Sequence, residues 1–579
     1  MGFLRRGLTL PAFLLCLVFS AHAYYASVKA TGIPVSFQVN LTWDDYQPAG
    51  VPQRMILANG QFPAPALRLK QWDDVEFLVN NEMPFPTTVH FHRYPWSDGV
   101  PGLSQRPIPP GESFLYKWQA TNHGGYFYHA HNRVPQEDGL YGAIHILSDD
   151  SIERPFALIS ENEHEIQAMR KAENKSISVM LSDGSVTCLG QQTLDKYTSV
   201  AQRSVLGDQS LTDIGYLPPN NLLTQGSWPH FLSAIPQTVF SGCVPSNGLT
   251  ERFYPDATIG YASFDLISAA FVSTITFSID EHSIYVYAVD GSYIVPIKAD
   301  GITITNGARY SVLVKLDKPR GNYIIRIANT GLNQILYATA LMTYRNGSGP
   351  LQQRPSTPSV DLVGTPASNH TLLDKPAIVP LAHQDVSQLD VAQTLVLMLE
   401  RYNNSSYTWT MGNSSFPLRL EEDSPLLFYP QTGVKDFTAA TKNGTWVDLV
   451  FDIANAFQPP HPIHKHSNEF YVLGEDNGKW DYSSVAEAAK HIPEMFNFKT
   501  PQIRDTFATP PAATGPTWLA LRYHVINPGA FLMHCHIQIH QSGGMALALL
   551  DGIDESPEIP EEYHLPQSEE ESELEDAGF

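Results

Sequence analysis

The stretch that most constrains this chain lies near its C-terminus, at His534-Cys535-His536, with His540 and Met545 close behind. Two imidazoles, a thiolate and a weak axial thioether are the ligand set of a blue-copper electron-transfer site. If the stretch is a β-strand, its side chains alternate between faces, so Cys535 points one way and the two flanking histidines the other. The cysteine would then bind one metal ion while its covalent neighbours bind others.

Two histidine pairs occur early in the chain on strand-like sequence, at His90-x-His92 and His129-x-His131. Residues two apart in a strand share a face, so each pair projects two imidazoles in the same direction. If the two strands are neighbours, the four imidazoles surround a shared space. The sequence therefore predicts ligand pairs here, although a single pair could also be ordinary polar surface.

A further histidine group, His461, His464 and His466, precedes the C-terminal stretch. The first of them stands before Pro462, which restricts its backbone to extended conformations. The other two again share one face of a strand. Ten histidines in such groups, with one cysteine, exceed the four ligands that close a structural zinc site. Copper, which accepts imidazole and thiolate readily, is the better prediction.

The composition favours β-sandwiches over helical bundles. Hydrophobic residues make up 43% of the 579 residues and charged residues 16%, so a large core is expected. Short Val, Ile, Tyr, Phe and Thr runs are broken by 44 Pro and 39 Gly, a pattern typical of short strands and turns. We therefore expect an all-β chain. The expected strands include 35–39, 75–79, 270–279, 283–289 and 310–314.

The N-terminus has the pattern of a secretory signal. Arg5 and Arg6 precede an apolar run at 8–19 and a small-x-small site that ends at Ala23. The run is shorter than the ~20 residues of a spanning helix, so we expect a protein that is secreted to the exterior or cell wall, with no membrane partner. Sequons predict a glycosylated surface. They are Asn40, Asn174, Asn346, Asn369, Asn403, Asn404, Asn413 and Asn443.

Cys188 and Cys243 remain once Cys16 is assigned to the signal and Cys535 to the histidine motif. In an oxidising compartment this pair predicts one disulfide bond. A formal net charge of −23 argues against nucleic acid as a partner. The expected parts are a signal peptide at 1–23, sandwiches at 24–150, 151–345 and 386–553, a Pro/Ser/Thr-rich linker at 346–385, and an acidic disordered tail at 554–579.

Taken together, the histidine motifs resemble those of the multicopper oxidases, the group of laccases, ascorbate oxidases and ferroxidases. The resemblance extends from about residue 53 to 548 and is closest to ascomycete laccase-like enzymes of pigment and secondary-metabolite pathways. It implies three cupredoxin-like Greek-key sandwiches, a monomer, and four coppers: one type 1, one type 2 and two type 3. The cluster of type 2 and type 3 coppers should lie between the first and last sandwiches.

The resemblance also implies a role for each ligand. Cys535, His461 and His540 would hold the type 1 copper, with Met545 as its axial ligand. The type 2 copper would be held by His90 and His464, one type 3 copper by His92, His129 and His536, and the other by His131, His466 and His534. Cys535 and His540 would carry electrons from the substrate.

Several positions depart from the family pattern, whereas Asp98 matches it. Arg93 follows the first histidine pair where the family usually has glycine. Asp98 matches the carboxylate that assists proton delivery near the type 2 copper, although it could be a plain Asp-Gly turn residue. Gln538 replaces a common Glu or Asp and cannot shuttle a proton. Met545 stands where high-potential laccases have Leu or Phe, which implies a modest oxidant.

These features predict a secreted laccase-type oxidase that oxidises phenols, such as a naphthol or polyketide phenol, and reduces O2 to water. A ferroxidase is the alternative within the same family and would need acidic residues around His540. A copper-binding or electron-carrier protein without turnover is the alternative outside it. A lone blue-copper domain would suffice for that role, and the remaining histidines would have no function.

Overall fold

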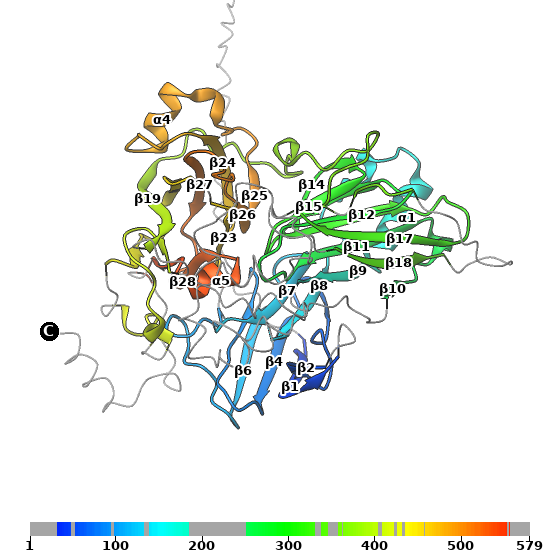
Figure 1. The fold of residues 1–579 in the computed structure, drawn as a ribbon, viewed down its shortest axis with the longest axis horizontal. Coiled ribbons are helices and arrows are strands. Elements are labelled where there is room, and N and C mark those ends of the chain that lie inside the picture. The colour runs from blue at the N-terminus through cyan, green and yellow to red at the C-terminus, as the bar shows by residue number, and fades with distance from the viewer. Residues whose placement is uncertain are drawn as a thin grey trace, which may run out of the picture. The chain divides into compact units, whose positions relative to one another are not determined.

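The strands of the described residues form six sheets, which pair into three sandwiches. The computed structural model describes residues 32–47, 52–93, 98–132, 138–183, 250–330, 337–344, 357–361, 363–402, 408–421, 425–430, 435–456, 458–552 and 555. The predicted signal peptide, the Cys188–Cys243 pair and nearly all of the acidic tail lie outside these residues. In Figure 1 the first sandwich is blue to cyan, the second mainly cyan-green to green, and the third yellow-green to red.

The first sandwich packs the sheet β2-β1-β4-β6 against the sheet β3-β8-β7-β5. Its strands alternate as a half-buried sheet should: in β4 the side chains of Val75, Phe77 and Val79 are buried and their neighbours are not. The strands are β1 (Val35–Tyr46), β2 (Gln53–Ala58), β3 (Leu67–Lys70), β4 (Asp74–Asn81), β5 (Val89–Phe91), β6 (Ser113–Gln119), β7 (Gly124–Ala130) and β8 (Tyr141–Leu147).

The second sandwich pairs the sheets β10-β18-β17-β12-β15 and β14-β13-β16-β11-β9. Its strands β11 and β12 are buried along their whole length, and their larger apolar side chains include Phe264, Ile275 and Phe277. The strands are β9 (Ile177–Leu181), β10 (Arg252–Phe253), β11 (Tyr261–Ser268), β12 (Ile275–Ile279), β13 (Ile284–Val289), β14 (Ser292–Ala299), β15 (Gly301–Ile304), β16 (Arg309–Lys315), β17 (Asn322–Asn329) and β18 (Tyr337–Thr343).

The third sandwich pairs the sheets β20-β19-β22-β27-β24-β25 and β21-β29-β28-β23-β26. Cys535 and Met545 are buried in the core between them. The strands are β19 (Val391–Arg401), β20 (Trp409–Met411), β21 (Thr438–Ala440), β22 (Trp446–Ile453), β23 (Pro462–Lys465), β24 (Phe470–Asn477), β25 (Gln502–Arg504), β26 (Thr506–Ala508), β27 (Thr517–His524), β28 (Gly529–Cys535) and β29 (Ala546–Asp551).

Helices are short in the described residues. The side chain of Asn162 caps α1 (Glu163–Glu173) by accepting the His164 amide, and Ser484 caps α4 (Val485–His491) in the same way. The helix α5 (Gln538–Ser542) follows the histidine-cysteine stretch directly. The 3-10 turns are η1 (Pro155–Leu158), η4 (Ala257–Ile259), η5 (Lys375–Ala377), η7 (Leu418–Glu421) and η9 (Pro493–Met495). The all-β prediction with three cupredoxin-like sandwiches is therefore confirmed.

Two segments differ in detail from the sequence-based expectation. Only Ile275–Ile279 of the predicted strand 270–279 forms a strand. The preceding residues form a loop because the amides of Phe271 and Ser273 donate to the Asp183 carboxylate. In the predicted linker 346–385, the side chains of Leu373 and Ile378 are buried in the core of the second sandwich. This part of the predicted linker packs against the second sandwich and is therefore not a surface connection.

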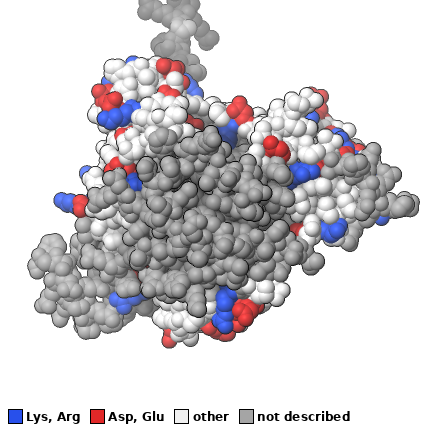
Figure 2. All heavy atoms as spheres, in the orientation of Figure 1, with Lys and Arg blue, Asp and Glu red and all other residues white. Residues whose placement is uncertain are grey.

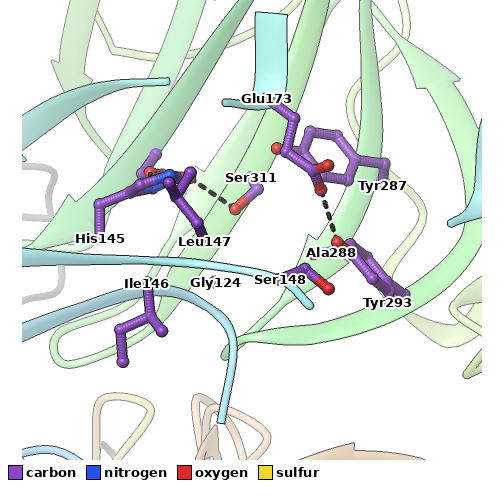
Figure 3. A pocket seen from close by; sticks show the side chains of 11 residues that line it. Gly124, His145, Ile146, Leu147, Ser148, Glu173, Tyr287, Ala288, Tyr293 and Ser311 are labelled. Carbon is purple, nitrogen blue, oxygen red and sulfur yellow. Dashed lines mark hydrogen bonds and ion pairs between the residues drawn. The ribbon is translucent and has the colours of Figure 1, made fainter. Parts of the chain in front are cut away.

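The contact between the first and second sandwiches contains a buried polar cluster. His145 Nδ1 lies 2.6 Å from Asp265 Oδ2, and the Ser311 hydroxyl donates to the other carboxylate oxygen at 2.7 Å. Figure 3 shows His145 and Ser311 beside a cavity with room for about one water molecule, with Glu173 and Tyr293, which share a hydrogen bond, on the other side. The cluster satisfies charges that the interface buries, and the cavity is too small for an organic substrate.

Charged side chains are interspersed on the described part of the face in Figure 2. Elsewhere in the described residues, oppositely charged side chains form exposed ion pairs such as Arg54–Asp45 and Lys479–Asp481. No helix in the described part of the chain is long and apolar enough to cross a membrane.

Candidate metal centres

The histidine pairs lie at the ends of neighbouring strands in two sandwiches. In the first sandwich β5 pairs with β7, and the register places His90 opposite His129. In the third sandwich β23 pairs with β28, and His464 lies opposite His534. Each strand ends within a residue or two of its histidine, so the second member of the pair follows directly. Strand pairing thus brings each set of imidazoles together, as the alternation predicts.

The two sets meet and interleave. The ring of His90 stacks on that of His466 with centroids 3.8 Å apart, and His92 stacks on His464 at 4.2 Å. Each stack joins the first sandwich to the third. The nitrogens form groups whose members all lie within 4.8 Å of one another: His90 with His92 and His464; His92 with His129 and His536; His131 with His466 and His534.

A separate group lies wholly within the third sandwich. The Nδ1 atoms of His461 and His540 are 3.2 Å apart, and Cys535 Sγ lies 3.8 Å and 3.6 Å from them. Met545 is fully buried in the same core. Its backbone carbonyl accepts from the Cys535 N–H at 3.1 Å, and its N–H donates to the His540 carbonyl at 2.9 Å. These four residues are the predicted type 1 ligands.

Cys535 and its flanking histidines face different groups. Cys535 belongs with His461 and His540, whereas His534 and His536 belong to two of the groups formed with the first sandwich. Ligands of the two centres are therefore direct neighbours in the chain. The strand alternation of β28 produces this arrangement, since adjacent side chains of a strand project to opposite faces.

The tautomers leave lone pairs for a metal. The Nδ1 atoms of His90, His129 and His534 lie 2.6, 2.8 and 3.0 Å from backbone carbonyls, which can only accept, so these nitrogens carry the proton. His464 Nδ1 lies 2.8 Å from the Asp505 carbonyl and is protonated for the same reason. Their Nε2 atoms are then unprotonated. This arrangement, with one ring nitrogen anchored and the other free, is typical of metal-binding histidines.

Burial keeps the imidazoles neutral. It lowers the pKa of His461 and His129 to about 3 and that of His534 to about 4, and it lowers the pKa of the other predicted ligand histidines well below the usual value. Several buried nitrogens also have no hydrogen-bond partner, including both of His131 and Nε2 of His90 and His464. Each such orphan costs about 1–3 kcal/mol unless a ligand takes its lone pair. The residues present therefore fit a copper cluster.

Asp98 lies against the cluster. Its Oδ1 is 2.7 Å from His466 Nδ1, its carbonyl accepts from His90, and its Oδ2 has no partner. Burial raises the pKa of the Asp98 carboxyl well above its usual value, with Lys465 opposing the shift. Gly99 fixes the turn at φ +70°, where a Cβ would overlap the Val89 carbonyl. The carboxyl thus contacts one predicted ligand directly and is able to hold a proton at Oδ2.

Sequence reasoning did not identify several residues around the centres. His461 Nε2 is 3.0 Å from Gln458 Oε1, which orients the ring so that Nδ1 points toward Cys535. The Trp409 ring lies 4.3 Å from that of His540, and the Arg401 guanidinium lies over Trp409 at 5.1 Å. Of these three residues, Gln458 alone lies close in sequence to a predicted ligand, three residues before His461. The other two are brought in by β19 and β20.

Gln538 is buried at the start of α5, and its backbone N–H donates to the Phe271 carbonyl at 3.0 Å. A carboxamide side chain does not release a proton, so Gln538 cannot take the role of the Glu or Asp that relatives often have at this position. The Asp98 carboxyl contacts the predicted cluster ligand His466 at 2.7 Å, and the Asp505 carboxylate lies 3.8 Å from Nδ1 of His464.

Comparison with known proteins places this architecture in a family. Models of the multicopper oxidase family match residues 40–151, 261–347 and 389–555. The chain is 39% identical to laccase abr2 of Aspergillus fumigatus, over 93% of this chain and 98% of the other. It is 37% identical to the multicopper oxidase VdtB of Byssochlamys spectabilis, over 96% and 87%. The chain therefore belongs to the multicopper oxidase family.

Solved structures share the fold. The laccase of Botrytis aclada superposes with a TM-score of 0.65 at 22% identity, covering 94% of this chain and 92% of the other. Fet3p, a multicopper oxidase that functions in iron import, gives 0.66 at 21% identity, covering 94% and 95%. The protein is a copper-dependent oxidoreductase that uses O2, and family membership implies four coppers of types 1, 2 and 3.

Proposed function

We propose that the protein is a laccase-type oxidase that takes single electrons from an electron-rich phenol and uses them to reduce O2 to water. Copper, when bound, supplies the one-electron chemistry at both centres. His461, Cys535 and His540 with Met545 would hold the type 1 copper. The eight remaining histidines would hold the other three coppers: His90 and His464 the type 2 copper, and the sets His92, His129, His536 and His131, His466, His534 the two type 3 coppers. The relatives named as laccases support this reaction class.

The observation that carries the proposal is the environment of His540, the imidazole through which the substrate electron would enter. Its ring faces Trp409 at 4.3 Å, and Arg401 lies over that tryptophan at 5.1 Å. Burial first, then His461 and Arg401, lower the pKa of His540. A positive charge that acts on this ring favours an anionic donor such as a phenolate and opposes Fe(II).

A path from substrate to O2 follows from the chain's own residues. Cys535 is bonded through the backbone to His534 and His536, which belong to two different cluster groups. These peptide bonds are the shortest covalent route between the centres. Asp98 would hold a proton at Oδ2 and deliver it beside His466, because its carboxyl is buried and its pKa is raised.

The ferroxidase alternative requires acidic side chains beside His540. Two acidic residues of α1 are engaged with other side chains: Glu165 pairs with Lys315 at 2.6 Å, and Glu163 accepts from Gln167 at 2.8 Å. Within the described residues, no carboxylate contributes to the pKa shift of His461 or His540, whereas Arg401 contributes to both. These contacts favour phenol oxidation over Fe(II) oxidation.

The proposed setting is extracellular or in the cell wall, with a monomer carrying glycans. The sequon residues Asn174, Asn369, Asn413 and Asn443 are exposed, so a glycan at each would meet no packing obstacle. A naphthol or related polyketide phenol is the proposed substrate class. Its radical product would dimerise or polymerise in solution, which is a common fate of phenoxyl radicals.

The test is oxygen uptake by copper-loaded protein with a diphenol, a naphthol, ascorbate and Fe(II) in parallel, for the wild type and Arg401→Glu. We expect wild-type turnover with phenols. The charge reversal should shift the ratio of phenol to Fe(II) oxidation toward Fe(II) by about tenfold or more, since 1.4 kcal/mol corresponds to a factor of ten. Arg54→Glu, an exposed charge reversal on β2, is the matched control and should leave the ratio unchanged. Wild-type activity on Fe(II) alone would overturn the proposal, and absence of any O2 uptake would favour the carrier alternative.

A further inference from the structure

Asp290 lies at a point where all three sandwiches meet. It is fully buried in the turn between β13 and β14 of the second sandwich and has a φ of +46°. Its Oδ1 accepts the Arg309 amide at 2.9 Å, and its Oδ2 accepts from Arg504 Nε at 2.7 Å. Its backbone carbonyl accepts from the Arg93 guanidinium at 2.6 Å. One residue therefore binds an arginine from each sandwich.

Each arginine leads to a histidine of the cluster. Arg93 is the residue directly after His92. Arg309 forms a two-pronged ion pair with Asp505 at 2.5 and 2.6 Å, and the Asp505 carbonyl accepts from His464 Nδ1 at 2.8 Å. Arg504 immediately precedes Asp505 and so fixes the same segment from its other side.

Arg309 reaches a further histidine through Gly307. Its guanidinium donates to the Gly307 carbonyl at 3.1 Å. The α-carbon of that glycine lies so close to the His536 ring that a Cβ would stand 2.5 Å from the ring carbon Cδ2. The guanidinium also lies over the Tyr126 ring of the first sandwich at 5.3 Å. The group Arg93, Asp290, Arg309, Arg504 and Asp505 is called the Asp290 junction below.

Arg93 is the unusual member of the junction. Its backbone adopts φ +69°, a conformation that glycine tolerates and larger residues rarely adopt. Its side chain is nonetheless buried and held by three partners: the Asp290 carbonyl, the Ser292 hydroxyl at 3.2 Å and the Glu469 carboxylate of the third sandwich. These contacts account for an arginine at a position whose conformation suits glycine.

We propose that Asp290 and Arg93 are positioning residues for the copper cluster: the Asp290 junction holds the segments that carry His92, His464 and His536 in register across the three sandwiches. None of the five junction residues is a predicted copper ligand, so their proposed action does not depend on the substrate class. Because outer-shell groups orient metal-binding histidines, its loss changes the geometry at the cluster while the type 1 group, which lies wholly in the third sandwich, is preserved.

The test uses the copper-loaded full chain and the variants Asp290→Asn, Arg93→Gly and Arg93→Lys. Copper per chain, the electron paramagnetic resonance spectrum and the steady-state kinetics toward O2 are measured for each. Asp290→Asn should change the type 2 signal or lose that copper and reduce turnover about 10- to 100-fold, with the blue absorption unchanged. Arg93→Gly should show the same changes more weakly, and Arg93→Lys should restore part of the wild-type signal.

Asp448→Asn is the matched control. Asp448 is buried and forms a similar two-pronged ion pair with Arg522, at 2.6 and 3.0 Å, but it belongs to the third sandwich alone. It should lower the melting temperature and leave both copper signals as in the wild type. A wild-type type 2 signal in Arg93→Gly, or the same spectral change in Asp448→Asn as in the junction variants, would overturn the proposal. If Asp290→Asn does not fold, the comparison of Arg93→Gly with Arg93→Lys decides the outcome.

Discussion

The two candidate copper centres differ in how many sandwiches build them. The group around Cys535 takes every predicted ligand from the third sandwich, and its surroundings are apolar residues such as Ile463 and Ile539. The eight-histidine cluster takes half of its ligands from the first sandwich and half from the third. Carbonyls and the Asp98 carboxyl hold its rings. One centre therefore depends on the core of a single domain, and the other depends on how domains dock.

This difference predicts which substitutions disturb each centre. A change within the third sandwich should damage the type 1 group through its packing, which is local. The cluster should instead respond to residues far from it in sequence, because its geometry is set where sandwiches meet. The Asp290 junction, which joins all three, is the clearest example.

The largest expected effect comes from Cys535→Ser. We expect loss of the blue absorption and of one copper per chain, with turnover falling to background because the covalent route between the centres no longer begins at a thiolate. The type 2 signal should persist.

The reciprocal variant is His131→Ala: both ring nitrogens of His131 lack a protein partner, so no protein hydrogen bond is lost. It should damage the cluster and leave the blue absorption. Copper analysis and absorption spectra check both, and joint loss of both signals in either variant would show that the centres are not separable.

Asp98→Asn should produce the next largest effect. We expect turnover to fall about 10²- to 10⁴-fold, the usual contribution of a positioned acid or base, while the blue absorption stays as in the wild type. Asp265→Asn is the matched control, since Asp265 is also buried and lies 2.6 Å from a histidine Nδ1, that of His145, away from the predicted ligand set. It should lower stability with little effect on turnover per folded chain. Equal losses of turnover in the two variants would show that Asp98 acts only through the fold.

Met545→Leu should produce the smallest effect and confine it to the type 1 group. Loss of the thioether removes a ligand that tunes the copper potential. We expect the type 1 reduction potential to rise, by about 59 mV for each tenfold shift in preference toward the reduced ion. The cluster spectrum should not change. Redox titration of the blue absorption measures the shift, and an unchanged potential would show that Met545 does not act as an axial ligand.

The sequence predicted the all-β fold and identified which side chains gather. A strand has a period of two, so the direction of His534, Cys535 and His536 could be read from their order alone. The structure gathers the predicted ligand residues into close nitrogen groups, and it also places His92 beside His90 and His464. Their individual roles as copper ligands stay predictions, as do the domain boundaries. The course of residues 270–274 and the burial of Leu373 could not be predicted, because both depend on partners in distant segments.

Tertiary structure alone decided the surroundings of the centres. Nothing near Asp98 in the sequence indicates that it bonds His466, which is 368 positions away, and nothing near Arg93 indicates Asp290. Local sequence determines which face of a strand a side chain takes, since backbone sterics fix that alternation. Which residues then meet across an interface depends on the packing of whole sandwiches, and no local period encodes it. The sequence by itself thus determined the metal chemistry, and the docking of the sandwiches decided which charges support it.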